Sequence, residues 1–313
     1  MSAVPTPIIL DCDPGHDDAL AILLAAAHPA IDLLAITTVG GNQTVEKCTI
    51  NARRICSVAG ITGVPIATGA AEPLLGSLHI GEYVHGVSGL DGPAWGEPTV
   101  AASSESAVDL IVRLLKEHPE PITLVPVGPL TNIALVLKTH PELAPRIREI
   151  VLMGGSTERG NDTPYAEFNI KVDPEAADIV FRSGVKVTMC GLNVTHQALA
   201  TPDVLERFAA LGTKLGDLCV ELLTFFSASY LRTWGFTSPP LHDPVAVARV
   251  IDDTLVECIH VPVVIETMGR FTAGATCVDL HHLSGEPDNA FVAMRLDTTR
   301  FWDLMIEAVA SYE

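Results

Sequence analysis

The sequence has few aromatic residues, few basic residues and no long apolar run. Lysine and arginine together number 19 against 38 acidic residues, which gives a formal net charge of −19. A chain this acidic repels phosphate backbones and anionic membranes, so we expect neither nucleic acid nor a membrane as a partner. The longest apolar run, residues 19–27, is far shorter than the roughly 20 residues that span a bilayer. No secretory signal is visible at the start, so we expect a cytoplasmic protein.

Cysteine pairs and the common nucleotide-binding motifs are also missing. The seven cysteines are scattered and none forms C-x-x-C, so a zinc site and a dithiol redox centre lack support. The sequence contains no G-x-G-x-x-G, Walker A loop, H-E-x-x-H or G-x-S-x-G. Dinucleotide, nucleoside triphosphate, zinc-protease and serine-hydrolase functions therefore lose their main signatures. Cys12 alternates with the acids on either side of it in an extended segment, so we expect it to pack in the core.

The sequence is rich in apolar residues, and short apolar runs alternate with segments of helical pattern. Hydrophobic residues make up 48% of the chain and charged residues only 18%. The predicted strands are near-continuous apolar runs, typical of strands covered on both faces: 8–11, 33–39, 122–126, 150–153, 185–189 and 261–265. The predicted helices lie between or after them: 17–27, 45–59, 106–117, 131–137, 174–182, 215–231 and 245–251. This alternation predicts an α/β fold with an open, mainly parallel doubly wound sheet, Rossmann-like and flanked by helices.

The rest of the chain is organised around loops. Residues 69–99 are rich in glycine and proline, residues 154–164 are rich in glycine and polar side chains, and both stretches follow apolar runs. Ligands of open parallel sheets bind at the carboxyl ends of strands, so these loops are expected to form the site. Residues 267–297 are less regular, and we expect an antiparallel excursion there. Because no composition break divides the chain, we predict one domain over residues 1–313.

The first predicted strand ends in a dense group of acids. Asp11, Asp13, Asp17 and Asp18 fall within one short segment. Carboxylates this close raise one another's pKa unless a positive charge neutralises them, and a hard divalent cation takes oxygen ligands. The last two acids could instead cap the following helix, but capping does not account for Asp13. The segment is therefore interpreted as half of a metal site.

Three other motifs are weaker when taken singly. Gly40-Gly41-Asn42 follows a predicted strand and could approach a hydroxylated ligand closely, or could form an ordinary turn in which Asn42 caps a helix. Asn161 and Glu167-Phe168-Asn169 suit a sugar, although such side chains are common on loop surfaces. His242-Asp243-Pro244 by itself is a common helix start with proline in the first turn.

Taken together and in order, the motifs resemble those of the inosine–uridine-preferring nucleoside hydrolases. The matching segments are Asp13-Pro14-Gly15-His16-Asp17-Asp18-Ala19, Val39-Gly40-Gly41-Asn42, Val127-Gly128-Pro129-Leu130-Thr131-Asn132, Met153-Gly154-Gly155, Ala166-Glu167-Phe168-Asn169 and His242-Asp243-Pro244. The resemblance extends from Ile8 to about Val250. It implies the nucleoside hydrolase fold, one bound Ca²⁺, and cleavage of the N-glycosidic bond of a ribonucleoside to give ribose and a free base. It also implies a homodimer or homotetramer.

The resemblance further implies roles for individual residues. The Ca²⁺ ligands would be Asp13, Asp18, Asp243 and the backbone carbonyl of Val127. Asp13 would also act as general base on a Ca²⁺-held water. The ribose would be held by Asp17, Asn42, Met153, Asn161, Glu167 and Asn169.

On the base side, His242 is the implied group for the departing base, and His85 is a second candidate. Phe226, Tyr230 and Trp234 repeat every four residues and could stack on a base, with Phe168 nearby, although such a stripe is more often core. The role of His16, where many relatives are expected to carry an apolar residue, and the choice between purines and pyrimidines are left open.

Two other functions agree with parts of the pattern. A Mg²⁺-dependent phosphatase of the haloacid dehalogenase type also places Asp-x-Asp after its first strand, but that signature usually continues with Gly-Thr rather than Pro14-Gly15. A non-catalytic Ca²⁺-dependent binder of nucleosides or ribose could share the whole site apart from the general base. The presence of Asp13 favours an enzyme.

Overall fold

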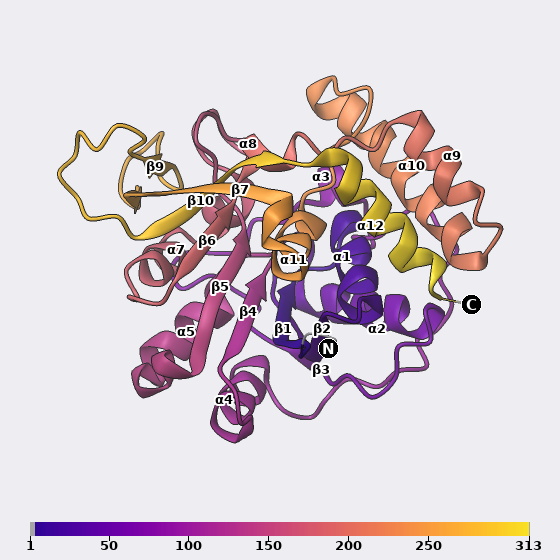
Figure 1. Ribbon diagram of the computed structural model, residues 1–313, viewed down its shortest axis with the longest axis horizontal. Coiled ribbons are helices and arrows are strands. Elements are labelled where there is room, and N and C mark those ends of the chain that lie inside the picture. The colour runs from indigo at the N-terminus through magenta and orange to yellow at the C-terminus, as the bar shows by residue number, and fades with distance from the viewer. Residues whose placement is uncertain (1–3, 313) are drawn as a thin grey trace.

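An eight-stranded sheet forms the centre of the computed structural model, which describes residues 4–312 (Figure 1). The strand order is β3-β2-β1-β4-β5-β6-β10-β7, and every neighbouring pair is parallel except β10 with β7. The strands are β1 (Thr6–Cys12), β2 (Ile31–Thr38), β3 (Ile66–Thr68), β4 (Ile122–Pro126), β5 (Ile147–Met153), β6 (Val187–Cys190), β7 (Val256–Val261) and β10 (Ala290–Leu296). The predicted mainly parallel, doubly wound α/β fold is confirmed.

Helices cover both faces of this sheet (Figure 1). One face packs against α1 (His16–Ala27), α2 (Val45–Val58), α9 (Pro202–Ala209), α10 (Lys214–Trp234), α11 (Asp243–Ile251) and α12 (Thr298–Ala310). The other packs against α4 (Ala107–Glu117), α5 (Thr131–Thr139) and α7 (Pro174–Phe181). Alternation along β1 supplies both cores, since Ile8, Leu10 and Cys12 face the first set and Ile9 the second. The burial of Cys12 agrees with its expected packing role.

Short helices occupy several loops. They are α3 (Glu82–His85), α6 (Phe168–Val172), α8 (Leu192–Thr195) and the 3₁₀ turns Pro141–Arg146 and Asp253–Leu255. The helix α3 lies within the glycine-rich stretch 69–99, and α6 begins just after the polar stretch 154–164. Both stretches were predicted to be site loops.

The predicted strand over residues 261–265 is wrong as a single element. Pro262 has no N–H to donate to a sheet, and the chain divides there into β7, which ends at Val261, and β8 (Val263–Ile265). The strand β8 pairs antiparallel with β9 (Thr276–Val278) in a separate two-stranded sheet, and β10 runs antiparallel to β7. The expected antiparallel excursion between residues 267 and 297 is therefore confirmed, although β3, β10, α9 and α12 were not predicted.

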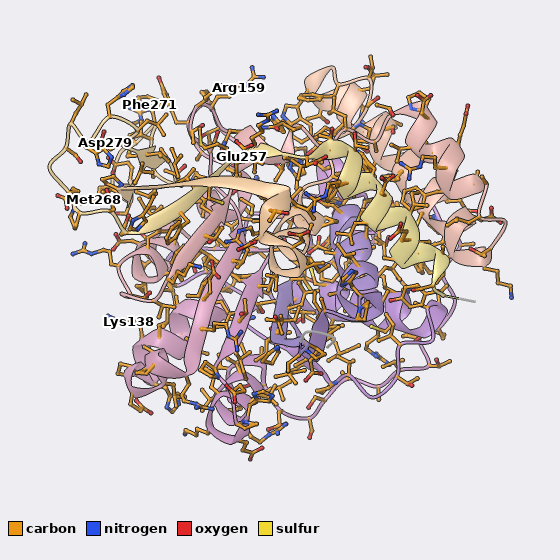
Figure 2. The ribbon with its side chains drawn as sticks, viewed as in Figure 1. Lys138, Arg159, Glu257, Met268, Phe271 and Asp279 are labelled. Carbon is orange, nitrogen blue, oxygen red and sulfur yellow. The ribbon has the colours of Figure 1, made fainter. Side chains whose placement is uncertain are left out.

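The β8–β9 hairpin projects from one end of the molecule. Its tip exposes Met268 (90%) and Phe271 (71%), which Figure 2 shows pointing away from the main sheet. Within residues 4–312, no helix is both long and apolar enough to cross a bilayer. The cysteines are unpaired, as their scattered spacing predicts.

The sheet changes direction of winding between β1 and β4. Ligands of doubly wound sheets bind outside the carboxyl ends of the strands at this point. The segment after β1 carries Asp13, and the segment after β4 carries Val127. The two segments are side by side, because the Val127 N–H donates to the Asp11 carbonyl at 2.8 Å. The topology thus brings the acidic motif and the Val127 carbonyl to one crevice.

Candidate active site

Two helix starts bring carboxylates from the two ends of the sequence together. Asp17 and Asp18 lie in the first turn of α1, and Asp243 is the first residue of α11. The helices α1 and α11 pack against each other. One carboxylate oxygen from each of the three residues lies within 4.8 Å of the others, and all three side chains are buried. The helix packing therefore creates a cluster of oxygen donors.

Asp13 lies beside this cluster but is not one of the three. Its Oδ2 accepts from the backbone N–H of Asn42 at 2.7 Å, whereas its buried Oδ1 has no hydrogen-bond partner among the residues that the structure describes. Side chains at Gly41 or Gly128 would collide with this carboxylate, which gives the glycines of both motifs a steric reason. The expected ligand set named Asp13 and Asp18, whereas the closest group of three contains Asp17.

The electrostatics of the four acids favour a cation. Burial, together with their mutual repulsion, raises the pKa of Asp13 and Asp243 well above the usual range and that of Asp17 to about 8. Burial also raises the pKa of Asp18. No lysine or arginine pairs with any of them in the part of the chain described. Clustered acids with an unpartnered oxygen and oxygen-only donors fit a hard divalent cation.

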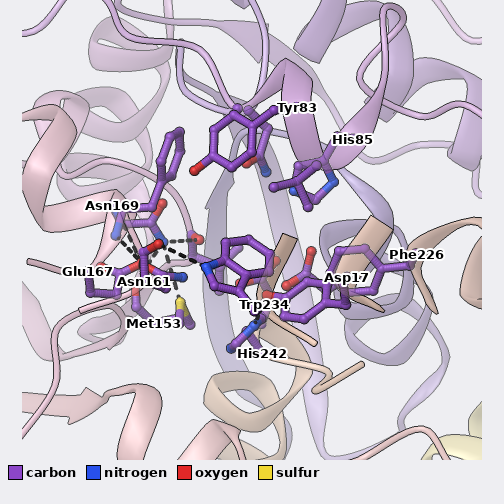
Figure 3. Close-up of a pocket in the computed structure, with 17 residues that line it drawn as sticks. Asp17, Tyr83, His85, Met153, Asn161, Glu167, Asn169, Phe226, Trp234 and His242 are labelled. Atoms are coloured by element: carbon purple, nitrogen blue, oxygen red, sulfur yellow. Dashed lines mark hydrogen bonds between the residues drawn. The ribbon is translucent and has the colours of Figure 1, made fainter. Parts of the chain in front are cut away.

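A pocket opens directly in front of the acids (Figure 3). Its empty volume, which includes space open to solvent, is about 460 Å³. Of the residues assigned roles from the sequence, Asp17, Asn42, His85, Val127, Met153, Asn161, Glu167, Phe168, Asn169, Phe226, Tyr230, Trp234, His242 and Asp243 line it. Asp13 and Asp18 do not line it and are fully buried. Three further lining residues, Gly81, Tyr83 and Val84, belong to or adjoin α3 and were not predicted from the sequence.

Hydrogen bonds fix the polar wall of the pocket. Glu167 caps α6, because its carboxylate accepts from the backbone N–H groups of Asn169 and Ile170 at 2.9 and 3.1 Å. Burial raises the pKa of Glu167 to about 7. The amide of Asn169 donates to the carbonyls of Val127 (2.8 Å) and Met153 (3.1 Å). The Val127 carbonyl, an expected metal ligand, is therefore held towards the site by a residue expected to bind ribose.

Three separate segments meet over the pocket. Asn161 accepts from the Phe168 N–H through its side chain (2.9 Å) and from the Trp234 indole N–H through its carbonyl (3.1 Å). The Tyr83 hydroxyl donates to Asp162 at 3.3 Å, and its ring meets Trp234 edge-on. These contacts join α3, the loop 154–166 and the end of α10. In Figure 3 the polar residues Asn161, Glu167 and Asn169 group on one side, opposite His85 and Phe226.

His242 is held by two hydroxyl groups. Its Nδ1 lies 2.8 Å from Thr195 Oγ1 and its Nε2 lies 2.6 Å from the Tyr230 hydroxyl. Burial lowers the pKa of His242 well below its usual range. His242 and Tyr230 were predicted from the sequence and Thr195 was not; its signal was its place in α8, the short helix after β6 at the edge of the sheet where sites form.

His16 and His85 form a histidine pair beside the pocket, which His85 lines. His16 Nδ1 lies 3.0 Å from His85 Nδ1, and His16 Nε2 lies 2.8 Å from the carbonyl oxygen of Asp91. The ring of His16 stacks on Phe225, Phe226 and His85. Burial lowers the pKa of His16 to about 4 and that of His85 well below its usual range. His16 thus faces neither solvent nor the acid cluster, which answers part of the question left open by the sequence.

Comparisons with known proteins agree with the geometry. The family model for the inosine-uridine preferring nucleoside hydrolases matches residues 8–303. The chain is 49% identical to the pyrimidine-specific ribonucleoside hydrolase RihA of Photobacterium profundum and 48% identical to RihA of Escherichia coli O7:K1, over 98% of this chain and 99% of each relative. The purine-preferring ribonucleoside hydrolase from Gardnerella vaginalis superimposes with a TM-score of 0.91 at 35% identity, over 97% of this chain and 98% of that one.

Proposed function

Because the chain belongs to the inosine–uridine-preferring nucleoside hydrolase family, we propose that it hydrolyses the N-glycosidic bond of ribonucleosides, with pyrimidine ribonucleosides as the preferred substrates. The main support for the proposal is the combination of an acid cluster and a two-sided pocket at one place. A buried carboxylate cluster, drawn from both ends of the sequence, forms one end of a pocket whose other walls are polar on one side and aromatic on the other. A ribonucleoside has the matching parts, namely a polyhydroxylated sugar and a flat base.

We propose Ca²⁺ as the resident cation, with Asp13, Asp18, Asp243 and the Val127 carbonyl as protein ligands and Asp17 adjacent to them. A cation held there would supply Lewis acidity to a water molecule and coordination positions for ribose hydroxyl groups. Asp13 takes the proton from the attacking water as general base. Its unpartnered Oδ1 is the available acceptor, while the bond from the Asn42 N–H holds the other oxygen in place.

The polar wall is assigned to the ribose. Asp17, Asn42, Asn161, Glu167 and Asn169 supply carboxylate and amide groups for its hydroxyls, and Met153 packs beside the ring. Several of these groups are already fixed by bonds to backbone, so little conformational entropy is lost on binding. Positive charge develops on the ribose as the C–N bond breaks, and the buried carboxylates stabilise that charge.

The aromatic wall is assigned to the base. Phe168, Phe226 and Trp234 provide apolar surface, and His242 acts on the departing base through Tyr230. When His242 carries its proton on Nε2, it donates to the Tyr230 oxygen and accepts from Thr195 at Nδ1. The Tyr230 hydroxyl hydrogen is then free to donate towards the base, whose negative charge grows as it leaves.

Similarity to the RihA enzymes supports the pyrimidine preference. Those relatives are pyrimidine-specific and about half identical to this chain, whereas the purine-preferring Gardnerella enzyme is 35% identical. A cytoplasmic homodimer or homotetramer stays a prediction from composition and resemblance.

Reducing-sugar release from a panel of ribonucleosides tests this function. We expect turnover of uridine and cytidine, slower turnover of inosine and adenosine, and loss of all turnover after chelation of divalent cations. Added Ca²⁺ is expected to restore activity because the four acids again have a counter-charge.

Two control measurements separate this function from the alternatives. Phosphate release from p-nitrophenyl phosphate with Mg²⁺ would indicate the phosphatase activity, and we expect none. Binding of uridine without any release of uracil, with Ca²⁺ present, would instead identify a non-catalytic binder and contradict the proposal.

The 2′-deoxyribonucleosides are expected to be poor substrates. A buried site built to hydrogen-bond a hydroxyl rejects an analogue without it by about 10⁴–10⁵-fold, since its polar groups are left unpaired. We expect 2′-deoxyuridine to show a kcat/KM lower than that of uridine by at least about 10²-fold, measured as uracil release. Equal kcat/KM values for the two would exclude the ribose-side assignments.

A further inference from the structure

Asn51 is a fully buried side chain on α2 to which the proposed reaction gives no task. Its Nδ2 donates to the Pro14 carbonyl at 3.1 Å and to the Ser88 carbonyl at 2.9 Å. A carbonyl oxygen can only accept, so both amide hydrogens are in use and the orientation of the amide is defined. Pro14 and Ser88 are far apart in the sequence, and Asn51 therefore joins two separate loops.

The first of these loops is the turn between the proposed metal ligands Asp13 and Asp18. The Asp18 carboxylate accepts from the backbone N–H of Asp13 at 3.1 Å and from that of Gly15 at 2.9 Å. In a trans peptide the C=O and the N–H point in opposite directions. The Pro14–Gly15 peptide is therefore bonded to the Asp18 carboxylate on one side and to Asn51 on the other. Anything that fixes the Asp18 carboxylate also restricts this peptide.

The second loop belongs to a segment that we call the flap, residues 82–91, which consists of α3 and the turn after it. The carboxylate of Asp91 closes this turn, because it accepts from the backbone N–H groups of Val87 and Ser88, each at 3.0 Å. Three residues of the flap line the pocket (Figure 3): Tyr83, Val84 and His85. Movement of the Ser88 carbonyl would therefore shift a wall of the pocket.

Two other side chains also hold the flap. Gln43 Nε2 donates to the Val87 carbonyl at 3.1 Å, and within residues 4–312 its amide forms no hydrogen bond with the turn at residues 13–18. His16 does connect α1 to the flap, since its Nε2 lies 2.8 Å from the Asp91 carbonyl oxygen. Loss of the Asn51 amide is therefore expected to weaken the connection between flap and turn strongly, but not to abolish it.

We propose that Asn51 is a positioning residue that couples the flap to the cation site. Occupancy of that site fixes the Asp18 carboxylate, and the Pro14–Gly15 peptide and the Asn51 amide then hold the flap against the base. The inference rests on the proposed function and extends it, because it makes the order of one pocket wall depend on the cation. Coupling between two sites is reciprocal, so a flap held by Asn51 also tightens cation binding.

Hydrogen–deuterium exchange of the flap tests this coupling without any turnover. The backbone N–H groups of Val87, Ser88, Gly89 and Asp91 are hydrogen-bonded within the flap, so their exchange requires local opening. We expect Ca²⁺ to slow this exchange in the wild-type protein by about fivefold or more, the lower end of usual coupling factors. Calorimetry on the same samples reports whether Ca²⁺ is bound.

The outcomes separate this inference from the proposed function. Bound Ca²⁺ with unchanged flap exchange would overturn the coupling even if the protein hydrolyses uridine. Slower flap exchange without any uridine hydrolysis would support the coupling and overturn the proposed function. Absence of Ca²⁺ binding would overturn both the coupling and the assignment of the cation.

Two matched variants test the role of Asn51 itself. Asn51→Leu and Gln43→Met each replace a buried amide that bonds the flap with an apolar side chain of similar size. Both should speed flap exchange and raise the KM for uridine, since each removes hydrogen bonds to the flap. Only Asn51→Leu should reduce the effect of Ca²⁺ on flap exchange to about twofold or less, and weaken Ca²⁺ binding by about fivefold or more.

A second substitution covers the case in which leucine at position 51 prevents folding. Asn51→Asp keeps the shape of the side chain but lacks the two donor hydrogens, and the same loss of Ca²⁺ dependence is expected. If either Asn51 variant kept the wild-type effect of Ca²⁺ on flap exchange, or if Gln43→Met lost it equally, Asn51 would act only through packing.

Discussion

Replacing Asp13 with asparagine is expected to lower kcat for uridine by about 10²–10⁴-fold, the usual contribution of a general base. The substitution keeps the size of the side chain and leaves an oxygen to accept from the Asn42 N–H. It removes the one group proposed to take the proton from water. Initial rates of uracil release, measured with saturating Ca²⁺, give the change in kcat.

The same substitution is expected to act in the opposite direction on stability without metal. One of four mutually repelling buried carboxylates is removed, so the melting temperature in chelator should be equal to or higher than that of wild type. Asp11→Asn is the matched control. Asp11 is buried two residues earlier, where its Oδ1 accepts from Thr37 and Asn132, and we expect its asparagine variant to keep kcat within a few-fold. Near-normal turnover by the Asp13 variant would refute its assignment as the base.

Tyr230→Phe is expected to lower kcat for uridine by about 10²–10⁴-fold while leaving an activated substrate nearly unaffected. The change removes only the hydroxyl that lies 2.6 Å from His242 Nε2 and is proposed to donate to the departing base. The leaving group of p-nitrophenyl β-D-ribofuranoside is stable as an anion and needs no such donor. Comparison of kcat for the two substrates therefore isolates leaving-group stabilisation from sugar binding and water activation.

Two further variants test whether the effect comes from the Tyr230 hydroxyl and not from the aromatic wall. His242→Gln should show the same substrate dependence as Tyr230→Phe, because His242 is proposed to act through the tyrosine. Phe226→Leu alters the aromatic wall without touching the hydroxyl, so any loss should be similar for both substrates. If Tyr230→Phe slowed uridine and the p-nitrophenyl riboside equally, the hydroxyl would have no special role in base departure.

The sequence predicted the parallel sheet well because its central strands are short apolar runs between amphipathic segments. It was less successful at the end of the chain, where β7 and β10 mix buried residues with partly or fully exposed ones and Pro262 divides an apolar run. The strand β10 enters the sheet between β6 and β7, an order that no local pattern encodes.

Most of the residues that line the pocket could be named from the sequence, but their positions relative to one another could not. The closeness of Asp17 rather than Asp13 to Asp243 depends on how α1 packs against α11. Thr195 and Tyr83 lie in segments without a motif and reach the site only through the loops that carry them. The partnership of His16 with His85 joins residues far apart in the sequence, so no spacing could have shown it.

The packing of α1 against α11 also determines how late in translation the carboxylate cluster can form. Asp17 and Asp18 leave the ribosome early, whereas Asp243 is translated only after most of the chain, and contacts between such distant segments form slowly. Until α11 docks, the early acids lack their third partner, and β5, the strand that α11 contacts, lacks part of its cover. A nascent chain that ends before residue 243 cannot assemble the carboxylate cluster, so the capacity to retain a divalent cation marks a polypeptide whose folding is nearly complete.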